Sequence, residues 1–315
     1  MTIKPNFFIV GAPKCGTTAM SEYLRTHPNI HMSPHKEPNF FSSDIAPSVY
    51  PGLDEYLSLF ETHDRNKIVF FEASTTYLYS NVALKRIYDL FPDSKIMAML
   101  RNPVYLVYSL HGELLNLGHE TEWDFETAWH LQAERRKGRN VPASTRNRSA
   151  LLQYNAFGSI GSQVRALNNI FPQSQIHTAI FDDFVSDPGA EYRRLLDFLN
   201  VPDDGREDFP RLNESKRFRS TALAGWSRKV RAMALPLAEN IKSHMGIERL
   251  GIINFVDRFN RQTRPRPPLR PEFRNYLIET FAPEVDLLET LLCRDLSAWK
   301  NTSNSAGILQ TTENR

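Results

Sequence analysis

The stretch from residue 7 to residue 18 constrains the fold more than any other part of the chain. An apolar run, Phe-Phe-Ile-Val, leads into Gly11, a tight turn closes at Gly16, and helical spacing follows. A strand, a glycine-bounded loop and a helix in this order bring backbone N–H groups and the positive end of a helix dipole to one point. We therefore predict that the loop binds an anion. The residues expected to contact that anion are Lys14, Cys15, Gly16, Thr17 and Thr18.

The position of the lysine separates this loop from a standard nucleoside triphosphate loop. The spacing from Gly11 to Gly16 fits a P-loop, but a Walker A loop carries lysine directly after the second glycine, where this chain has Thr17. Here the lysine lies inside the loop, at Lys14. The loop therefore predicts an anionic ligand, and other residues must decide which one.

Length and composition limit the classes of protein to consider. With 315 residues, of which 41% are hydrophobic, the chain can bury one substantial core, so one elaborated domain is expected. A formal charge of +2 argues against nucleic acid as the main partner. The sequence has no apolar run of the ~18 residues that a membrane-spanning helix needs. It also lacks a signal-peptide pattern, and its only cysteines are Cys15 and Cys293, so we expect a cytoplasmic protein.

Strand and helix patterns alternate along the chain, which predicts an α/β fold with a central parallel sheet and helices on both faces. The expected strands are at residues 7–10, 68–72, 95–100 and 176–181. The expected helices are at residues 18–27, 53–60, 81–91, 104–117, 124–137 and 151–171. We expect residues 1–220 to form the core, residues 221–300 a helical extension of the same domain, and residues 301–315 a disordered tail.

The helical pattern from Trp226 to Met245 gathers apolar residues on one side. Such a face fits peripheral contact with a membrane, a lid over an acceptor, or ordinary packing on the core. Pro236, in the middle of the pattern, favours packing.

A second candidate site follows the expected strand at residues 95–100. Arg101 comes directly after the strand, and Ser109 lies about two turns into the next helix. Doubly wound sheets bind ligands beyond the carboxyl ends of their strands, so both side chains are expected to reach one phosphate group. The alternative is an arginine exposed at a strand end and a serine bonded to the preceding helical turn.

Together these patterns resemble the sulfotransferases that use 3′-phosphoadenosine 5′-phosphosulfate (PAPS). The sequence Pro-Lys-Cys-Gly-Thr-Thr at residues 13–18 is similar to the 5′-phosphosulfate loop of that family, and Arg101 with Ser109 matches its 3′-phosphate motif. The resemblance spans most of residues 6–220. It implies that the chain uses PAPS as co-substrate, releases 3′-phosphoadenosine 5′-phosphate and needs no metal.

A third segment carries the candidate base. Residues 35–41, His-Lys-Glu-Pro-Asn-Phe-Phe, resemble the Lys-Glu-x-x-Phe-Phe segment of the carbohydrate-type and bacterial branches of the family. The resemblance implies that Glu37 is the general base and that Glu37 and Lys14 are the catalytic residues. His35 is the alternative base. The structural alternative for Glu37 is an ion pair with Lys36 or a nearby arginine on a surface loop.

Two further segments are similar to less diagnostic parts of the family. Residues 72–75, Glu-Ala-Ser-Thr, resemble its Gly-Glu-x-Ser segment, with Phe71 in place of the usual glycine, and Glu72 is expected to orient the acceptor or Lys14, or to cap the turn. Residues 213–220 fall where related proteins return a basic loop over the nucleotide, and a solvated basic turn is the alternative. The cations expected to contact the nucleotide there are Lys216, Arg217 and Arg219.

Three functions remain open at this point. The resemblance implies transfer of a sulfuryl group from PAPS to a hydroxyl or amine of a small-molecule, lipid or saccharide acceptor by in-line displacement. The second function is a P-loop kinase or nucleoside triphosphatase that uses ATP and Mg²⁺, with Asp182 and Asp183 as its carboxylates. The third is nucleotide binding without catalysis, with Glu37 in a structural role. The sequence leaves the acceptor and the oligomeric state undetermined.

Overall fold

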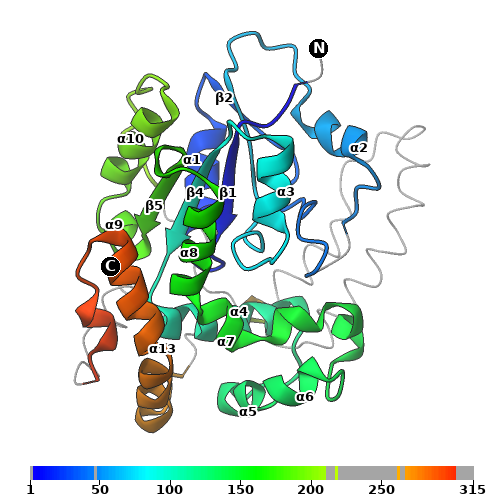
Figure 1. The fold of residues 1–315 in the computed structure, drawn as a ribbon, viewed down its shortest axis with the longest axis vertical. Coiled ribbons are helices and arrows are strands. Elements are labelled where there is room, and N and C mark those ends of the chain that lie inside the picture. Colours follow the sequence, from blue (N-terminus) through cyan, green and yellow to red (C-terminus); the bar gives the residue numbers. More distant parts are fainter. Residues whose placement is uncertain (1–2, 46–47, 211–216, 219–260, 263–266, 303–315) are drawn as a thin grey trace.

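The computed structural model describes residues 3–45, 48–210, 217–218, 261–262 and 267–302. At its centre lies a parallel sheet of five strands in the order β2-β3-β1-β4-β5 (Figure 1). The strands are β1 (Phe7–Gly11), β2 (Ile30–Met32), β3 (Val69–Ala73), β4 (Lys95–Leu100) and β5 (Ile176–Ile180). Every residue of β1 is buried, as an apolar run in the middle strand of a covered sheet requires.

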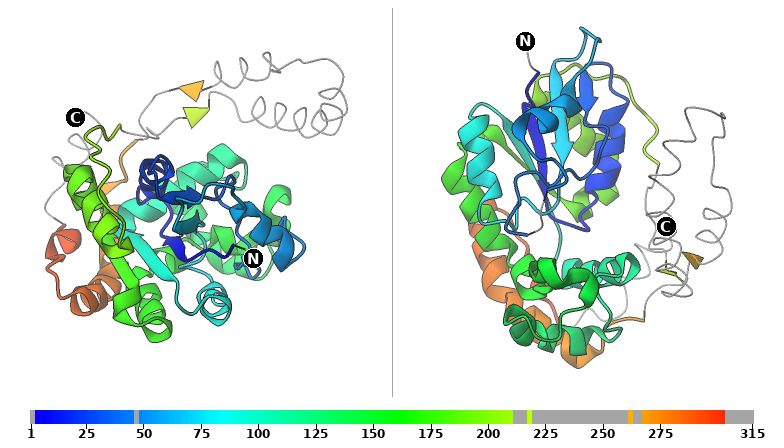
Figure 2. Two further views of the ribbon diagram at one scale, coloured as in Figure 1. Left: turned by 90° about the horizontal axis from the view of Figure 1, so that it is seen from above. Right: turned by 90° about the vertical axis from the view of Figure 1, so that its right-hand side faces the viewer.

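Helices cover both faces of the sheet. The chain crosses from β1 to β2 through α1 (Thr17–Arg25) in one direction, and from β3 to β4 through α3 (Ala83–Leu90) in the other. Because such crossovers are right-handed, α1 and α3 lie on opposite faces. The crossover to β5 runs in the same direction as that of α3, which places α8 (Ile160–Ile170) beside α3, as the two views of Figure 2 also show.

A layer of helices lies beyond the carboxyl ends of the strands, in the lower part of Figure 1. It is made of α4 (Pro103–Leu117), α5 (Phe125–His130), α6 (Gln132–Arg136) and α7 (Tyr154–Gly158). The long helix α13 (Pro271–Leu292) packs along α8, and a Cβ on Gly161 would lie only 2.3 Å from the carbonyl oxygen of Glu284. Gly161 therefore permits this close helix contact.

The remaining described elements complete the fold. They are α2 (Leu53–Leu57), α9 (Phe181–Ser186), α10 (Pro188–Leu199), the 3₁₀ helices η1 (Ser58–Phe60), η2 (Ala143–Leu152), η3 (Gln173–Gln175) and η4 (Ser297–Lys300), and the antiparallel pair β6 (Arg217–Phe218) and β7 (Arg261–Gln262). Within the described residues, no helix has the length and apolar character needed to cross a bilayer.

The predicted fold class is confirmed, and the four expected strands are present with β2 as a short fifth. The continuous helix predicted at residues 151–171 is wrong. That stretch begins in η2, and α7 and α8 are separated at Ser159, whose ψ of 54° is not helical. The helix predicted at residues 124–137 is likewise divided at Leu131.

Several predictions fall on residues outside the described part of the chain. These are Lys216, Arg219, the Trp226–Met245 helix and nearly all of the predicted tail. The division into residues 1–220, 221–300 and 301–315 stays a prediction.

Candidate active site

The loop between β1 and α1 has the backbone geometry of an anion cradle. Gly16 precedes α1 with a φ of 85°, and Lys14 has a φ of 63°. Both residues are therefore left-handed, a conformation that glycine adopts at little cost. The first N–H groups of α1, from Thr17 onward, have no carbonyl partner within the helix, so they remain available to an anion beside the loop. Thr17 itself is buried and Thr18 is half-buried.

Cys15 contributes to this loop through its backbone. Its side chain is fully buried, and its Sγ donates to the carbonyl oxygen of Pro13 at 3.3 Å. Burial raises the pKa of the Cys15 thiol to about 12, against the opposing charges of Arg101 and Lys14. The thiol is therefore protonated at neutral pH and unsuited to act as a nucleophile.

The two predicted anion-binding cations lie together. The guanidinium of Arg101 donates from Nη1 to the backbone oxygen of Lys14 at 3.3 Å and lies 4.4 Å from the centre of the Phe181 ring. The ammonium of Lys14 pairs with Glu113 on α4 at 3.2 Å. Loop, strand end and helix therefore converge, as expected for residues at the carboxyl edge of a parallel sheet.

Ser109 lies on the same side of α4 as Glu113, because residues four apart share one helix face. The start of α4 is fixed by Asn102, whose side chain accepts from the N–H of Val104 at 3.0 Å, and by Pro103 in the first turn. Since Glu113 reaches Lys14, the half-buried Ser109 faces the loop side of the helix.

Glu37 is held by two neighbours. The hydroxyl of Thr75 donates to both of its carboxylate oxygens, at 3.1 and 3.0 Å, and Lys36 forms the ion pair that the structural alternative predicted, at 3.3 Å. The Glu37 side chain is still 30% exposed. The ion pair therefore leaves the carboxylate open to solvent and to a ligand. The alternative base, His35, bonds through Nδ1 to the hydroxyl of Tyr50 at 2.6 Å.

Glu72 lies near the carboxyl end of β3, as expected, but its side chain is enclosed in the interior. It is fully buried, and its carboxylate accepts hydrogen bonds from Tyr56 at 2.9 Å, Tyr77 at 2.7 Å and Ser74 at 2.6 Å. Burial raises the pKa of Glu72 to about 7, opposed by these three hydrogen bonds and assisted by the charge of Glu37. Glu72 is thus an interior acceptor that organises its surroundings.

This burial predicts a pH-dependent stability. The folded protein holds the Glu72 proton more tightly than the unfolded chain does. The stability that this proton contributes is therefore fully present below pH 4.5 and is lost as the pH rises through 7. Glu72→Gln removes this ionisation. From pH 4.5 to 8 the difference in unfolding free energy between variant and wild type should shift by about 3 kcal/mol in favour of the variant. Urea unfolding of both proteins across that range measures the shift, and parallel stability profiles would reject it.

The two carboxylates considered for magnesium are engaged by the C-terminal part of the chain. Asp182 and Asp183 lie in the first turn of α9, where the sequence suggested a turn. Asp182 accepts from the indole N–H of Trp299 at 3.2 Å, and Asp183 forms a bidentate pair with Arg294. These contacts disfavour the kinase alternative.

Of the three cations predicted in the basic loop, the structure describes only Arg217, at the level of the backbone. It lies in β6, opposite Gln262 of β7. Its role at the nucleotide stays a prediction, as do those of Lys216 and Arg219.

Sequence reasoning missed the partners of the catalytic candidates. Glu113 follows Ser109 by four residues, so helical spacing could have indicated that both lie on the same face. Thr75 lies in the segment that resembles the family, but no local sequence pattern indicated a contact between Thr75 and Glu37.

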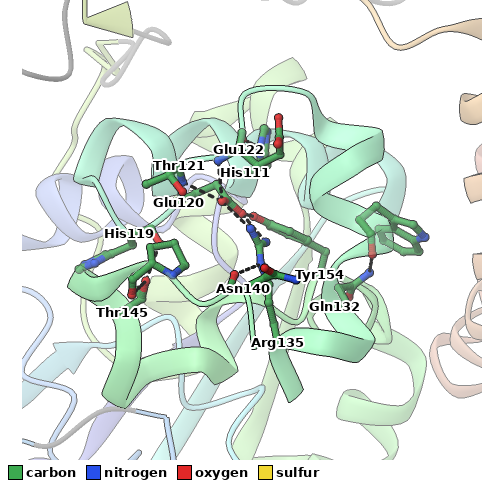
Figure 3. Close-up of polar contacts among 12 residues, drawn as sticks. His111, His119, Glu120, Thr121, Glu122, Gln132, Arg135, Asn140, Thr145 and Tyr154 are labelled. Atoms are coloured by element: carbon green, nitrogen blue, oxygen red, sulfur yellow. Dashed lines mark hydrogen bonds and ion pairs between the residues drawn. The ribbon is translucent and has the colours of Figure 1, made fainter. Parts of the chain in front are cut away.

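A buried ion pair was also missed (Figure 3). Arg135 donates to both carboxylate oxygens of Glu120, at 2.6 and 2.7 Å, and Tyr154 donates to one of them at 2.6 Å. Both charged side chains are almost wholly buried. Burial disfavours the charged form of Glu120, but the bonds from Arg135 and Tyr154 outweigh it and hold the pKa of Glu120 below its usual value.

Comparisons with known proteins agree with this geometry. Residues 4–222 match the family described as "Sulfotransferase domain". The sulfotransferase from Alicyclobacillus acidocaldarius has a similar structure, with a TM-score of 0.68 and 29% identity over 95% of this chain and 100% of that one.

Curated relatives match more narrowly. Mouse heparan sulfate glucosamine 3-O-sulfotransferase 3B1 is 29% identical over 202 residues, which cover 62% of this chain and 46% of that protein. Rat carbohydrate sulfotransferase 15 is 30% identical over 148 residues, covering 33% and 26%. The chain thus spans less than half the length of these relatives. Because the family match extends over most of the chain and includes the loop, Arg101 and Glu37, this protein belongs to the sulfotransferase-domain family.

Proposed function

We propose that this protein transfers a sulfuryl group from PAPS to a hydroxyl or amine of its acceptor. The observation that carries the proposal is the convergence of Lys14 and Arg101 at the glycine-bounded loop, with Ser109 on the adjacent helix face. Membership of the sulfotransferase family supports PAPS as the donor.

The residues present fit a nucleotide with two separate phosphate groups. Lys14, the loop N–H groups and the threonine hydroxyls supply donors at one position, and Arg101 with Ser109 supplies donors at the other. PAPS brings an activated sulfuryl group to this site. Lys14 and the N–H groups at the start of α1 stabilise the negative charge that develops on the departing phosphate.

Glu37 is proposed as the general base. Its carboxylate is oriented by Thr75 and partly exposed, so it can take the proton from an acceptor hydroxyl or amine as that atom attacks sulfur in line with the leaving phosphate. Glu113 pairs with the Lys14 ammonium and therefore competes with the anion for it. The named acceptors of the relatives make saccharides the first class to test.

The deciding experiment follows transfer of labelled sulfate from PAPS to a panel of saccharide, lipid and small-alcohol acceptors, with and without a chelator. We expect transfer to at least one acceptor class and equal rates in both conditions. Activity that requires ATP and Mg²⁺ would instead support the kinase alternative. Binding of 3′-phosphoadenosine 5′-phosphate without transfer or PAPS hydrolysis would support a non-catalytic protein.

A further inference from the structure

We infer that Glu72 and Ser74 are positioning residues that hold the loop of the catalytic base through a buried hydrogen-bond relay to Asn39. This inference rests on the proposed role of Glu37. It assigns to Glu72 a task different from acceptor binding, because its side chain is fully buried.

The first step of the relay fixes the direction of one hydroxyl. Ser74 is fully buried, and its Oγ–H donates to Oε2 of Glu72 at 2.6 Å. Tyr56 and Tyr77 both donate to the other carboxylate oxygen, Oε1. When Glu72 is ionised, the Ser74 proton is committed to its carboxylate, so the Ser74 hydroxyl acts as an acceptor toward its remaining neighbours.

The second step passes from Ser74 to the base loop. The N–H of Asn39 donates to Ser74 Oγ at 3.0 Å. Asn39 has a φ of 52°, a left-handed conformation that a non-glycine residue adopts only when its surroundings favour it. Its side chain accepts from Thr76 at 2.7 Å and donates to the backbone oxygen of Glu37 at 3.1 Å. The relay thus reaches the main chain of the base.

The same strand end also grips the Glu37 side chain. Thr75, next to Ser74, donates to both carboxylate oxygens of Glu37. The main chain and the carboxylate of Glu37 are therefore both held by hydrogen bonds that lead to residues 74–76, which directly follow β3. Because a base displaced by about 1 Å can lose on the order of 10²-fold in rate, such a tether affects turnover more than donor binding.

The variants follow the relay. Ser74→Ala removes the acceptor for the Asn39 N–H, and Glu72→Gln presents an amide that competes to donate to Ser74. Asn39→Gly keeps the left-handed backbone but loses both side-chain contacts. Because Asn39 is partly exposed, this substitution is the one of the three that should disturb folding least. The matched control is Tyr56→Phe, which removes a hydrogen bond to the same Glu72 carboxylate outside the arm that leads to Asn39.

We expect each relay variant to lower kcat at least about tenfold and to keep the KM for PAPS within about twofold of wild type; these variants are Ser74→Ala, Glu72→Gln and Asn39→Gly. The control Tyr56→Phe should keep kcat within about threefold of wild type. The double variant Glu72→Gln/Ser74→Ala should be no slower than its slower parent, because both changes break one relay. Circular dichroism and urea unfolding establish that each variant is folded.

If Glu37→Gln is inactive, two results would overturn the relay while leaving the proposed function intact. The first is a folded Ser74→Ala or Asn39→Gly variant with wild-type kcat. The second is a loss of kcat in Tyr56→Phe equal to that in Ser74→Ala. Full activity in Glu37→Gln would reject Glu37 as the base, and the relay would then have no catalytic group to position. The two failures are therefore separated by one additional variant.

Discussion

Replacing Glu37 by glutamine is expected to lower kcat by about 10²–10⁴-fold while leaving the affinity for 3′-phosphoadenosine 5′-phosphate unchanged. Glutamine has nearly the same shape and still offers an oxygen to the hydroxyl of Thr75, so the loop should keep its conformation. What it lacks is the ability to accept the acceptor's proton. The nucleotide contacts assigned to Lys14 and Arg101 involve other atoms and should be unaffected.

The measurement combines steady-state kinetics with calorimetric titration of the spent nucleotide. Glu55→Gln is a matched control, because it makes the same chemical change at an exposed residue of α2. Equal losses of turnover and nucleotide affinity in Glu37→Gln would indicate a disturbed loop rather than a lost base. If Glu37→Gln keeps its turnover and His35→Gln loses it, the base is His35.

The fold was predictable where local pattern and tertiary environment agree. The apolar runs of β1 and β4 are buried on both faces, so their composition alone identifies them. The break between α7 and α8 was not predictable from local spacing. A Cβ on Gly158 would lie 2.3 Å from the ring of Phe281, so α13 packs closely against the chain next to this break. That contact joins residues far apart in the sequence.

The site shows the same division. Lys14 and Arg101 could be predicted as candidates because each closely follows a strand that the sequence reveals. The buried environment of Glu72 was missed because it includes Tyr56 and Tyr77, which meet its carboxylate only after folding. Motif spacing predicts the groups that a loop or strand end presents, whereas the partners that orient those groups come from tertiary packing.

Breaking the buried pair of Glu120 and Arg135 is the change expected to cost most in stability. Arg135→Met should lower the free energy of unfolding by about 3–5 kcal/mol, because it leaves a carboxylate buried without its counter-charge. The arginine also donates from Nε to the carbonyl oxygen of Asn140 at 3.2 Å, so its loss frees the loop after α6. Urea unfolding at pH 7 measures the change.

The double variant Glu120→Gln/Arg135→Met separates the charge from the packing. Glutamine carries no charge, and its amide NH₂ can donate to the Tyr154 hydroxyl where the carboxylate accepted from it, so the double variant should recover a substantial part of the stability lost in Arg135→Met. The backbone N–H groups of Thr121 and Glu122 donate to one oxygen of Glu120, at 2.7 and 2.9 Å, and the amide oxygen of glutamine in that position keeps an acceptor for both. A double variant less stable than Arg135→Met would show that the carboxylate is satisfied by Tyr154 and these N–H groups alone, and that Arg135 contributes through packing rather than charge.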